Sequence, residues 1–242
     1  MLNNPYKSSS FAKFYDDKNM KNRLMDPIVG KLMGLRYKSH PWHGIDLGDN
    51  APEIVTCFIE MVPTDTVKYE VDKVSGYLKL DRPQKYSNVV PALYGFLPQT
   101  FCGEGVSELA KERTGINDVK GDGDPLDICI LTEKEITHGD IIVEAKPIGG
   151  FRLIDNNEAD DKIIAVLNND AVYGNYNDIC DCPALIIDRL KHYFLTYKDL
   201  PGEKRNCEIT NVYGIKEAQE TIRRAMDDYS NRFNNFEAML KI

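Results

Sequence analysis

Short apolar runs alternate with polar residues from about residue 45 to residue 170, which is the pattern of β-strands. Five of these segments are rich in β-branched or aromatic residues. We expect strands at 56–62, 67–71, 127–133, 140–148 and 161–167. The range 71–83 predicts a hairpin with its turn at 73–76. The unbroken apolar residues 128–131 predict a strand that is buried on both faces.

Residues 98–121 interrupt these strands with a long polar stretch that contains four glycines. We expect a long loop here. Loops of this length are usually functional or mobile.

The last third of the chain changes to helical spacing. One helix is expected within 181–202, with its N-cap at Asp181 or Cys182, and it would bury Ile186, Leu190, Phe194 and Tyr197. A strand at 207–214 and a second helix within 216–240 follow. Many strands followed by helices predict an α+β fold, a small closed, OB-like β-barrel flanked by two C-terminal helices.

The composition agrees with one globular domain. The chain has 242 residues, of which 42% are hydrophobic, so it can bury a substantial core. We expect an N-terminal arm or tail at 1–39 and a single domain at 40–242. No apolar run approaches the roughly 20 residues of a membrane span. The first 26 residues lack the apolar stretch of a secretory signal, so we do not expect one there. The six scattered cysteines predict reduced thiols in a cytoplasmic protein, and the net charge of -8 argues against nucleic-acid binding.

The segment VKGDGDPLDICIL, residues 119–131, places Asp122, Asp124 and Asp127 just before an apolar strand. A solvated turn would explain the first two, but a free carboxylate is costly at the start of a buried strand. An EF-hand is excluded, because Asp127 stands where the loop needs glycine and no glutamate closes it. An aspartyl-phosphatase motif fits poorly, because its apolar strand comes before the acids. A site for a hard cation explains all three aspartates.

A second acidic segment, DNNEADDK at residues 155–162, follows another expected strand. Its acids are Asp155, Glu158, Asp160 and Asp161. A charged loop would explain this segment alone. Two acidic clusters at strand ends, however, could meet at one rim of a barrel and bind several Mg²⁺ ions, which prefer oxygen ligands.

Basic and phenolic residues could complete a phosphate-binding site. Lys68 and Glu70 share a strand face, where a weak surface ion pair is the simpler explanation. A lysine at a helix end, such as Lys198, could equally complement the helix dipole. Arginine and lysine are nevertheless the usual partners of phosphate. Beside the acids, we expect the donors to be Lys68, Arg82, Lys162, Tyr197 and Lys198.

The segment DGDPLD, residues 122–127, resembles the signature of the soluble inorganic pyrophosphatases of family I, which are β-barrel enzymes. Other segments match that family in the same order: IEMVPTDTVKYEVD, GYLKLDRP, LYGFLP, AKPIGGFRLIDNNEADDKIIAV and HYFLTYKDL. The resemblance covers about residues 40–215. It implies that residues 40–242 form a single pyrophosphatase catalytic domain.

The resemblance implies Mg²⁺-dependent hydrolysis of inorganic pyrophosphate to two orthophosphates, by in-line attack of a metal-activated water, in a homo-oligomer. It assigns several Mg²⁺ ions to Asp122, Asp127, Asp155 and Asp160. It makes Asp124 the general base. It assigns substrate binding to Lys68, Arg82, Tyr94, Lys162, Tyr197 and Lys198. It also makes Glu60 and Glu70 cavity carboxylates.

The chain departs from this family in two places. Val90 stands where the family often has a tyrosine, so that donor is absent or supplied by Lys85 or Tyr86. Residues 98–121 are also longer than the matching stretch of compact bacterial members. Two other functions stay open: a non-catalytic protein that binds phosphate or divalent ions on the same barrel, and a general phosphomonoesterase.

The segment HPWHG places His40 and His43 beside Trp42 with no acid at metal-ligand spacing. We interpret Trp42 as a packing or interface anchor and both histidines as structural.

Overall fold

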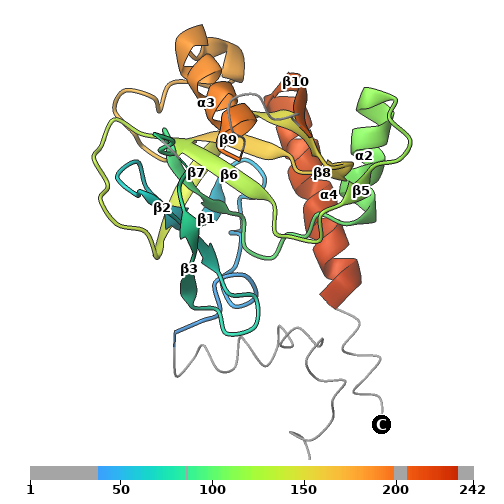
Figure 1. The fold of residues 1–242 in the computed structure, drawn as a ribbon, viewed down its shortest axis with the longest axis horizontal. Coiled ribbons are helices and arrows are strands. Elements are labelled where there is room, and N and C mark those ends of the chain that lie inside the picture. The colour runs from blue at the N-terminus through green and yellow to red at the C-terminus, as the bar shows by residue number, and fades with distance from the viewer. Residues whose placement is uncertain (1–37, 86, 199–205, 234–242) are drawn as a thin grey trace, which may run out of the picture.

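The computed structural model describes residues 38–85, 87–198 and 206–233. Its strands are β1 (Val55–Met61), β2 (Val67–Val71), β3 (Leu78–Pro83), β4 (Leu93–Phe96), β5 (Lys120–Gly121), β6 (Asp127–Leu131), β7 (Ile141–Asp155), β8 (Glu158–Ala159), β9 (Lys162–Leu167) and β10 (Cys207–Gly214). Its helices are α2 (Glu104–Thr114), α3 (Ala184–Thr196) and α4 (Ile215–Phe233), with a 3₁₀ turn η3 (Ile179–Asp181). In Figure 1, α3 lies above the strands, and α4 and α2 lie together on their right side.

Five strands form a closed ring. β1 pairs antiparallel with β4 and with β7, β4 pairs with β6, and β9 joins β7 to β6. Only the β6–β9 pairing within this ring is parallel. β10 adds to the outside of β7. The predicted α+β class and closed, OB-like strand arrangement are confirmed.

The predicted hairpin is also confirmed, as a separate antiparallel sheet of β2 and β3. Gly76 closes its turn with a left-handed φ of 73°, and its N–H donates to the Asp72 carbonyl at 2.8 Å. A Cβ at this position would lie 2.8 Å from the His40 ring. Glycine therefore supplies both the backbone conformation and the close approach.

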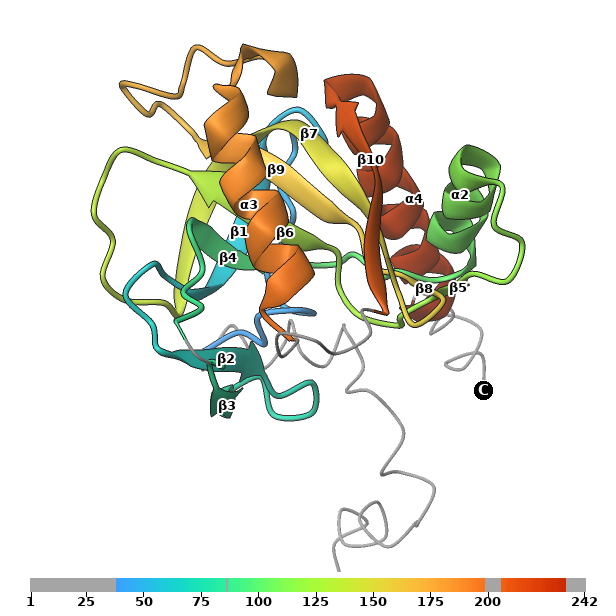
Figure 2. The same ribbon diagram turned by 45° about the horizontal axis from the view of Figure 1, so that its top comes forward.

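The helices cover different sides of the ring (Figure 2). α3 packs Leu190 and Phe194 against Phe151 of β7, as its helical spacing predicts. α4 packs Ala218 and Ile222 into the other main core. Each helix therefore buries one apolar stripe against the sheet.

Both expected C-terminal helices are present, and the structure differs from the prediction where each of them begins. Pro183 is the N-cap of α3, instead of Asp181 or Cys182, because residues 178–181 form a separate turn with reciprocal capping by Asp178 and Asp181. α3 ends at Thr196, and α4 runs from Ile215 to Phe233. Residues 1–37 of the expected arm, 199–205 and 234–242 lie outside the described residues.

The expectation of a loop throughout 98–121 is wrong, because α2 occupies Glu104–Thr114. Val106, Leu109 and Ala110 are fully buried on one helical face. Gly115 ends the helix with a left-handed φ of 72°. The segment is polar on average and has only a few apolar positions. Its composition therefore indicated a loop instead of a helix.

A charged network lies inside the protein beside β9. Arg152 of β7 is completely buried and forms ion pairs with Asp161 at 2.9 Å and with Glu217 of α4 at 2.8 Å. Tyr213 donates a further hydrogen bond to Asp161 at 3.0 Å. Burial raises the pKa of Asp161 to about 6, and Arg152 opposes that shift. Asp161 therefore depends on Arg152 for its charge balance.

We predict that Arg152→Leu lowers the free energy of unfolding by about 3–5 kcal/mol, because it leaves Asp161 buried without its cation. Chemical denaturation measures this change. Arg223→Leu is the matched control, because Arg223 is half exposed and lies 3.9 Å from its acidic partner, Glu53. The control is expected to change stability by less than about 0.5 kcal/mol. Equal losses in the two variants would contradict the importance of the buried pair.

Candidate active site

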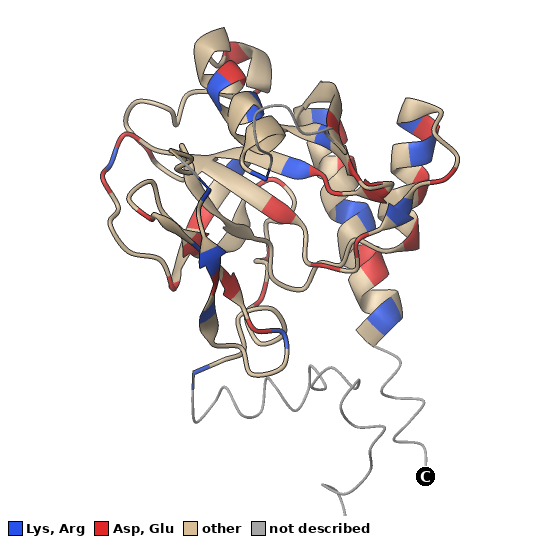
Figure 3. Ribbon diagram, viewed as in Figure 1, with Lys and Arg blue, Asp and Glu red and all other residues tan. Residues whose placement is uncertain are grey.

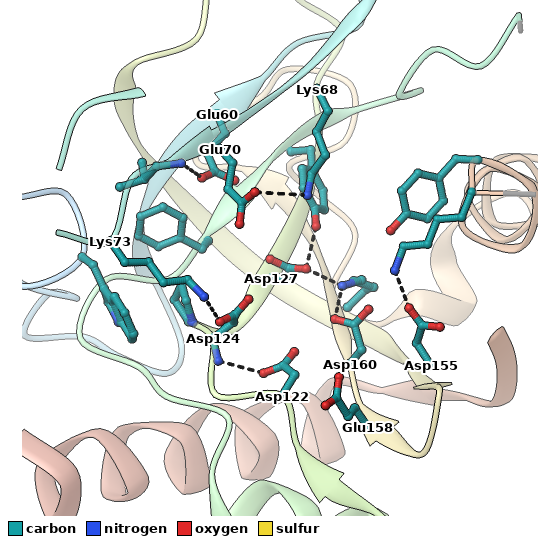
Figure 4. Close-up of a pocket in the computed structure, with 18 residues that line it drawn as sticks. Glu60, Lys68, Glu70, Lys73, Asp122, Asp124, Asp127, Asp155, Glu158 and Asp160 are labelled. Carbon is teal, nitrogen blue, oxygen red and sulfur yellow. Dashed lines mark hydrogen bonds and ion pairs between the residues drawn. The ribbon is translucent and has the colours of Figure 1, made fainter. Parts of the chain in front are cut away.

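A cavity of about 180 Å³ opens where the ring, the β2–β3 hairpin and the end of α3 meet (Figure 4). This is below the roughly 300–1,000 Å³ of pockets for drug-sized ligands, so it suits a small ligand. Its lining residues are Trp42, Glu60, Lys68, Glu70, Val71, Lys73, Tyr94, Phe96, Asp122, Asp124, Pro125, Asp127, Asp155, Glu158, Asp160, Lys162, Tyr197 and Lys198.

The structure brings together every predicted site residue except Arg82. Arg82 lies on β3, and its guanidinium pairs with the neighbouring Asp81 instead of lining the cavity. The two acidic clusters meet as expected. Figure 3 shows acidic positions at the start of β6 and around β8, with a basic position at the start of β9.

The loop before β6 turns tightly to present its aspartates. The Asp124 N–H donates to Oδ1 of Asp122 at 2.9 Å, and Gly123 between them has a left-handed φ of 77°. Asp124 forms an ion pair with Lys73 from the hairpin turn. Asp127 then opens β6 and is half-buried. The turn therefore separates three like charges while leaving all of them on one cavity wall.

Lys162 lies at the centre of the site. The parallel register of β6 and β9 places Asp127 opposite Lys162, whose ammonium forms ion pairs with Asp127 and Asp160. Tyr94 donates its hydroxyl to Oδ2 of Asp127 at 2.5 Å. Burial opposes the charged form of Lys162, but the two carboxylates raise its pKa above the ordinary value. The lysine is therefore a buried cation that the acids hold.

The C-terminal end of α3 contributes the other side of the cavity. Lys198 forms an ion pair with Asp155, the last residue of β7. Burial opposes the charge on Lys198, but Tyr197 and Asp155 raise its pKa above the ordinary value. Tyr197 stacks on Tyr193 with 5.1 Å between ring centroids, which orients its phenol. A cation and a phenol are thus available side by side.

The β1 and β2 strands supply the cavity carboxylates. Glu60 accepts the Val71 N–H at 2.7 Å, and burial raises the pKa of Glu60 to about 8. Glu70 lies 3.8 Å from Lys68, measured between Oε2 and Nζ. The period-two alternation of β2 therefore does place Lys68 and Glu70 on one face.

Asp122 has acidic neighbours, and none of the ion pairs between the described residues gives it a lysine or arginine partner. Burial, followed by the charge of Asp160, raises the pKa of Asp122 to about 8. Burial also raises the pKa of Asp160, although Lys162 offsets part of that effect. Carboxylate oxygens in such surroundings fit a divalent cation, which would favour their ionised form.

Within the described ranges, no three acidic, histidine or cysteine side chains are already grouped to hold one ion. This arrangement still suits Mg²⁺, because Mg²⁺ commonly uses one or two carboxylates and completes its shell with water and phosphate oxygens.

Sequence reasoning missed Lys73 and misplaced Asp161. The sequence predicts Lys73 only as part of a turn, and no local pattern connects it with Asp124, 51 residues further along the chain. The sequence pattern places Asp161 among the site acids, but in the structure it faces Arg152 in the interior. Lys85 does not line the cavity, and Tyr86 lies outside the described residues. Val90 is completely buried.

Trp42 has the packing role that its sequence context indicated. It is 2% exposed, and its indole N–H donates to the Thr100 carbonyl at 2.7 Å. His43 is buried beside it, with Nδ1 2.8 Å from the Tyr229 hydroxyl. Trp42 also contributes an apolar part of the cavity wall.

A family model described as inorganic pyrophosphatase matches residues 57–230. This chain belongs to the inorganic pyrophosphatase family. The inorganic pyrophosphatase of Chlamydia trachomatis serovar L2 is 52% identical over 200 residues, which cover 81% of this chain and 96% of that protein. The soluble inorganic pyrophosphatase of Oryza sativa subsp. indica is 31% identical over 206 residues, which cover 85% of this chain and 86% of that protein.

A solved member of the inorganic pyrophosphatase family has the same fold. The crystal structure from Thermus thermophilus superimposes with a TM-score of 0.64 and 31% identity, covering 77% of this chain and 97% of that one. The family is generally metal-dependent. Among the described residues, no helix is long and apolar enough to span a membrane.

We predict that Asp122→Asn stabilises the metal-free protein, by about 1–3 kcal/mol more at pH 8.5 than at pH 5. The folded chain holds a proton on Asp122 up to about pH 8. The unfolded chain loses that proton near pH 3.9. Stability from this carboxyl is therefore lost as the pH rises through that interval. Denaturant unfolding in a chelator measures the effect.

Asp118→Asn is the control for this experiment, because Asp118 is an exposed loop residue. Its unfolding curve is expected to match that of the parent at both pH values. An Asp122→Asn variant that is less stable than the parent at pH 8.5 would contradict the electrostatic account.

Proposed function

We propose that this member of the inorganic pyrophosphatase family hydrolyses inorganic pyrophosphate to two orthophosphates with Mg²⁺. One observation supports this most strongly: a single small cavity contains carboxylates that can bind cations and, facing them, lysines and tyrosines that can bind phosphate. Pyrophosphate is a compact polyanion, so it must be neutralised before an oxygen nucleophile can approach. A cavity with both kinds of group can do this.

Four carboxylates would hold the metal ions in this proposal: Asp122, Asp127, Asp155 and Asp160. They come from two segments whose strands meet at one edge of the ring. Bound Mg²⁺ would neutralise phosphate oxygens and lower the pKa of water at the site. Asp127 and Asp160 already pair with the ammonium group of Lys162, and Asp155 pairs with that of Lys198. Positive charge is therefore favoured beside these three carboxylates.

The substrate side of the proposal consists of Lys68, Tyr94, Lys162, Tyr197 and Lys198. Their ammonium and phenol groups line the cavity and can donate to phosphate oxygens in several directions. Lys162 and Lys198 are paired with proposed metal ligands. If metal ions bound those carboxylates, both ammonium groups would become available to phosphate. Arg82 would contribute only after breaking its pair with Asp81.

Asp124 is the proposed general base. Lys73 holds its carboxylate on the cavity wall between the hairpin and the acidic loop. Asp124 would take one proton from the attacking water, with in-line displacement of the leaving phosphate. Glu60, which accepts the Val71 N–H, and Glu70, which lies beside Lys68, would contribute to the charge balance of the cavity. They would not take part in proton transfer.

We also propose that the protein is a cytoplasmic homo-oligomer. All six cysteines are free thiols, as in a reducing compartment. Tyr77 and Leu185 are 73% and 82% exposed, so apolar surface is available for association. Light scattering at known protein concentration decides the oligomeric state, and a monomer mass would reject this part of the proposal.

We predict that the parent chain releases phosphate from pyrophosphate in Mg²⁺ and that Asp124→Asn lowers kcat by about 10²–10⁴-fold, the usual contribution of general-base catalysis. A phosphate-release assay measures both. Asp188→Asn is the control, because Asp188 lies on the exposed face of α3 and is expected to leave kcat unchanged.

Other outcomes separate the alternative functions. Tight phosphate or Mg²⁺ binding without turnover would indicate a non-catalytic binding protein. Comparable turnover of a nitrophenyl phosphate would indicate a general phosphomonoesterase. Either result would reject the proposed specificity for pyrophosphate.

A further inference from the structure

The segment of residues 100–103 joins helix α4 to the acidic loop of the active site. On one side, the Phe101 N–H donates to the Ala225 carbonyl of α4 at 2.9 Å. On the other side, the Thr100 hydroxyl oxygen accepts the Leu126 N–H at 2.9 Å. This short segment therefore contacts both the C-terminal helix and the loop that carries Asp122 and Asp124 (Figure 1).

Asp228 of α4 holds the end of this segment. Its carboxylate accepts the N–H groups of Gly103, Gly105 and Val106 at 3.0, 2.9 and 3.0 Å. Gly103 is the N-cap residue of α2, and Gly105 and Val106 belong to its first turn, where N–H groups have no acceptor within the helix. Gly103 has no side chain that could accept them. A carboxylate from another helix therefore caps α2, where negative charge is also favoured by the helix dipole.

The glycines of this cap leave room for Asp228. A Cβ at Gly105 would lie 2.9 Å from Oδ1 of Asp228, and one at Gly103 would lie 3.2 Å from its Cγ. Larger residues would push the carboxylate away from the N–H groups. The small residues Gly103 and Gly105 therefore allow a carboxylate from another helix to cap α2.

The backbone of Cys102, next to the capped Gly103, is hydrogen-bonded to the active-site loop. Its N–H donates to the Asp124 carbonyl at 2.8 Å, and its carbonyl accepts the Gly123 N–H at 3.0 Å. The loop also lies directly on the segment at Gly121, where a Cβ would be 2.2 Å from the Cys102 carbonyl oxygen. A shift of residues 102–103 would therefore move the backbone on both sides of Asp122.

We propose that Asp228 is a positioning residue for the active site: by capping α2 from α4, it fixes residues 102–103 and so the backbone of Asp122 and Asp124. This role rests on the proposed function of those two aspartates. Asp228 itself does not line the cavity. In this proposal, residues 98–121, which include α2, help to position the active-site loop.

The test compares Asp228→Asn with Asp227→Asn. The amide introduced in place of the Asp228 carboxylate keeps the size of the side chain but has one acceptor oxygen instead of two, so it cannot serve all three N–H groups. Asp227 is the adjacent acid on the same helix and is exposed, and the N–H groups of Gly103, Gly105 and Val106 donate to Asp228 instead, so Asp227 serves as the matched control. Circular dichroism first confirms that both variants are folded.

Amide hydrogen exchange on the metal-free proteins tests the mechanical link without any activity. In Asp228→Asn, the amides of Cys102 and Gly123 are expected to exchange about tenfold faster than in the parent, an effect of the size that loss of a helix cap produces. Asp227→Asn is expected to match the parent. Faster exchange confined to α2, with Cys102 and Gly123 unchanged, would overturn the proposal.

Kinetics then test the consequence for the site. Asp228→Asn is expected to lower kcat about 10–100-fold and to raise the Mg²⁺ concentration that gives half-maximal activity, as loss of an outer-shell partner does. A merely structural role would lower the melting temperature but leave the Mg²⁺ dependence of the folded protein unchanged, and that result would overturn the proposal. If the parent chain itself fails to hydrolyse pyrophosphate, the proposed function is wrong, and the exchange experiment still decides the link.

Should Asp228→Asn fail to fold, Asp228→Glu provides the second variant. Its carboxylate keeps the charge but sits on a longer side chain beside Gly103 and Gly105, where space is short. The same exchange at Cys102 and Gly123 and the same shift in Mg²⁺ dependence are expected. Parent-like values in both measurements would overturn the proposal.

Discussion

The structure depends on one electrostatic constraint: several carboxylates share a small, partly buried cavity and need cations to balance them. Lys162 pairs with Asp127 and Asp160, Lys198 with Asp155, and Lys73 with Asp124. Asp122 has no such lysine among the described residues, and burial and its acidic neighbours raise its pKa. The protein thus provides some positive charge itself and leaves a place for more, which is what a site for metal ions and a polyanion requires.

The fold positions these charges through backbone pairing. The parallel contact of β6 and β9 places Asp127 opposite Lys162, while β7 ends at Asp155 and turns directly into the second acidic segment. The β2–β3 hairpin adds Lys68 and Lys73 from the other side. Farther from the cavity, Arg152 balances Asp161 in the interior and Asp228 caps α2. Rigid strands and buried polar contacts therefore hold a site that carries unfavourable charge.

Features that depend on local sequence were predictable. Alternating apolar residues indicated the strands, and the turn chemistry around Gly76 indicated the hairpin. The spacing of Asp122, Asp124 and Asp127 before a buried strand indicated cation chemistry, and resemblance to a family supplied the individual roles. The grouping of both acidic segments in one cavity agrees with their predicted positions at strand ends.

Features that depend on distant contacts were not predictable. Lys73 reaches Asp124 only because the hairpin folds over the acidic loop, and Asp228 reaches Gly103 across 125 residues of chain. Asp161 looked like another site acid because its neighbour Asp160 is one, yet adjacent residues near a strand start face opposite sides. The helix α2 was missed because its few apolar residues find their partners on α4, far along the sequence.

We propose that the acidic cavity holds Mg²⁺, and a titration of Mg²⁺ into the metal-free protein decides whether it does. Calorimetric titration without substrate is expected to show more than one Mg²⁺ ion bound per chain. Asp160→Asn is expected to weaken that binding, because Asp160 lies between Lys162 and Asp122 in the cavity. No Mg²⁺ uptake by the parent, or the same uptake by the variant, would contradict the account.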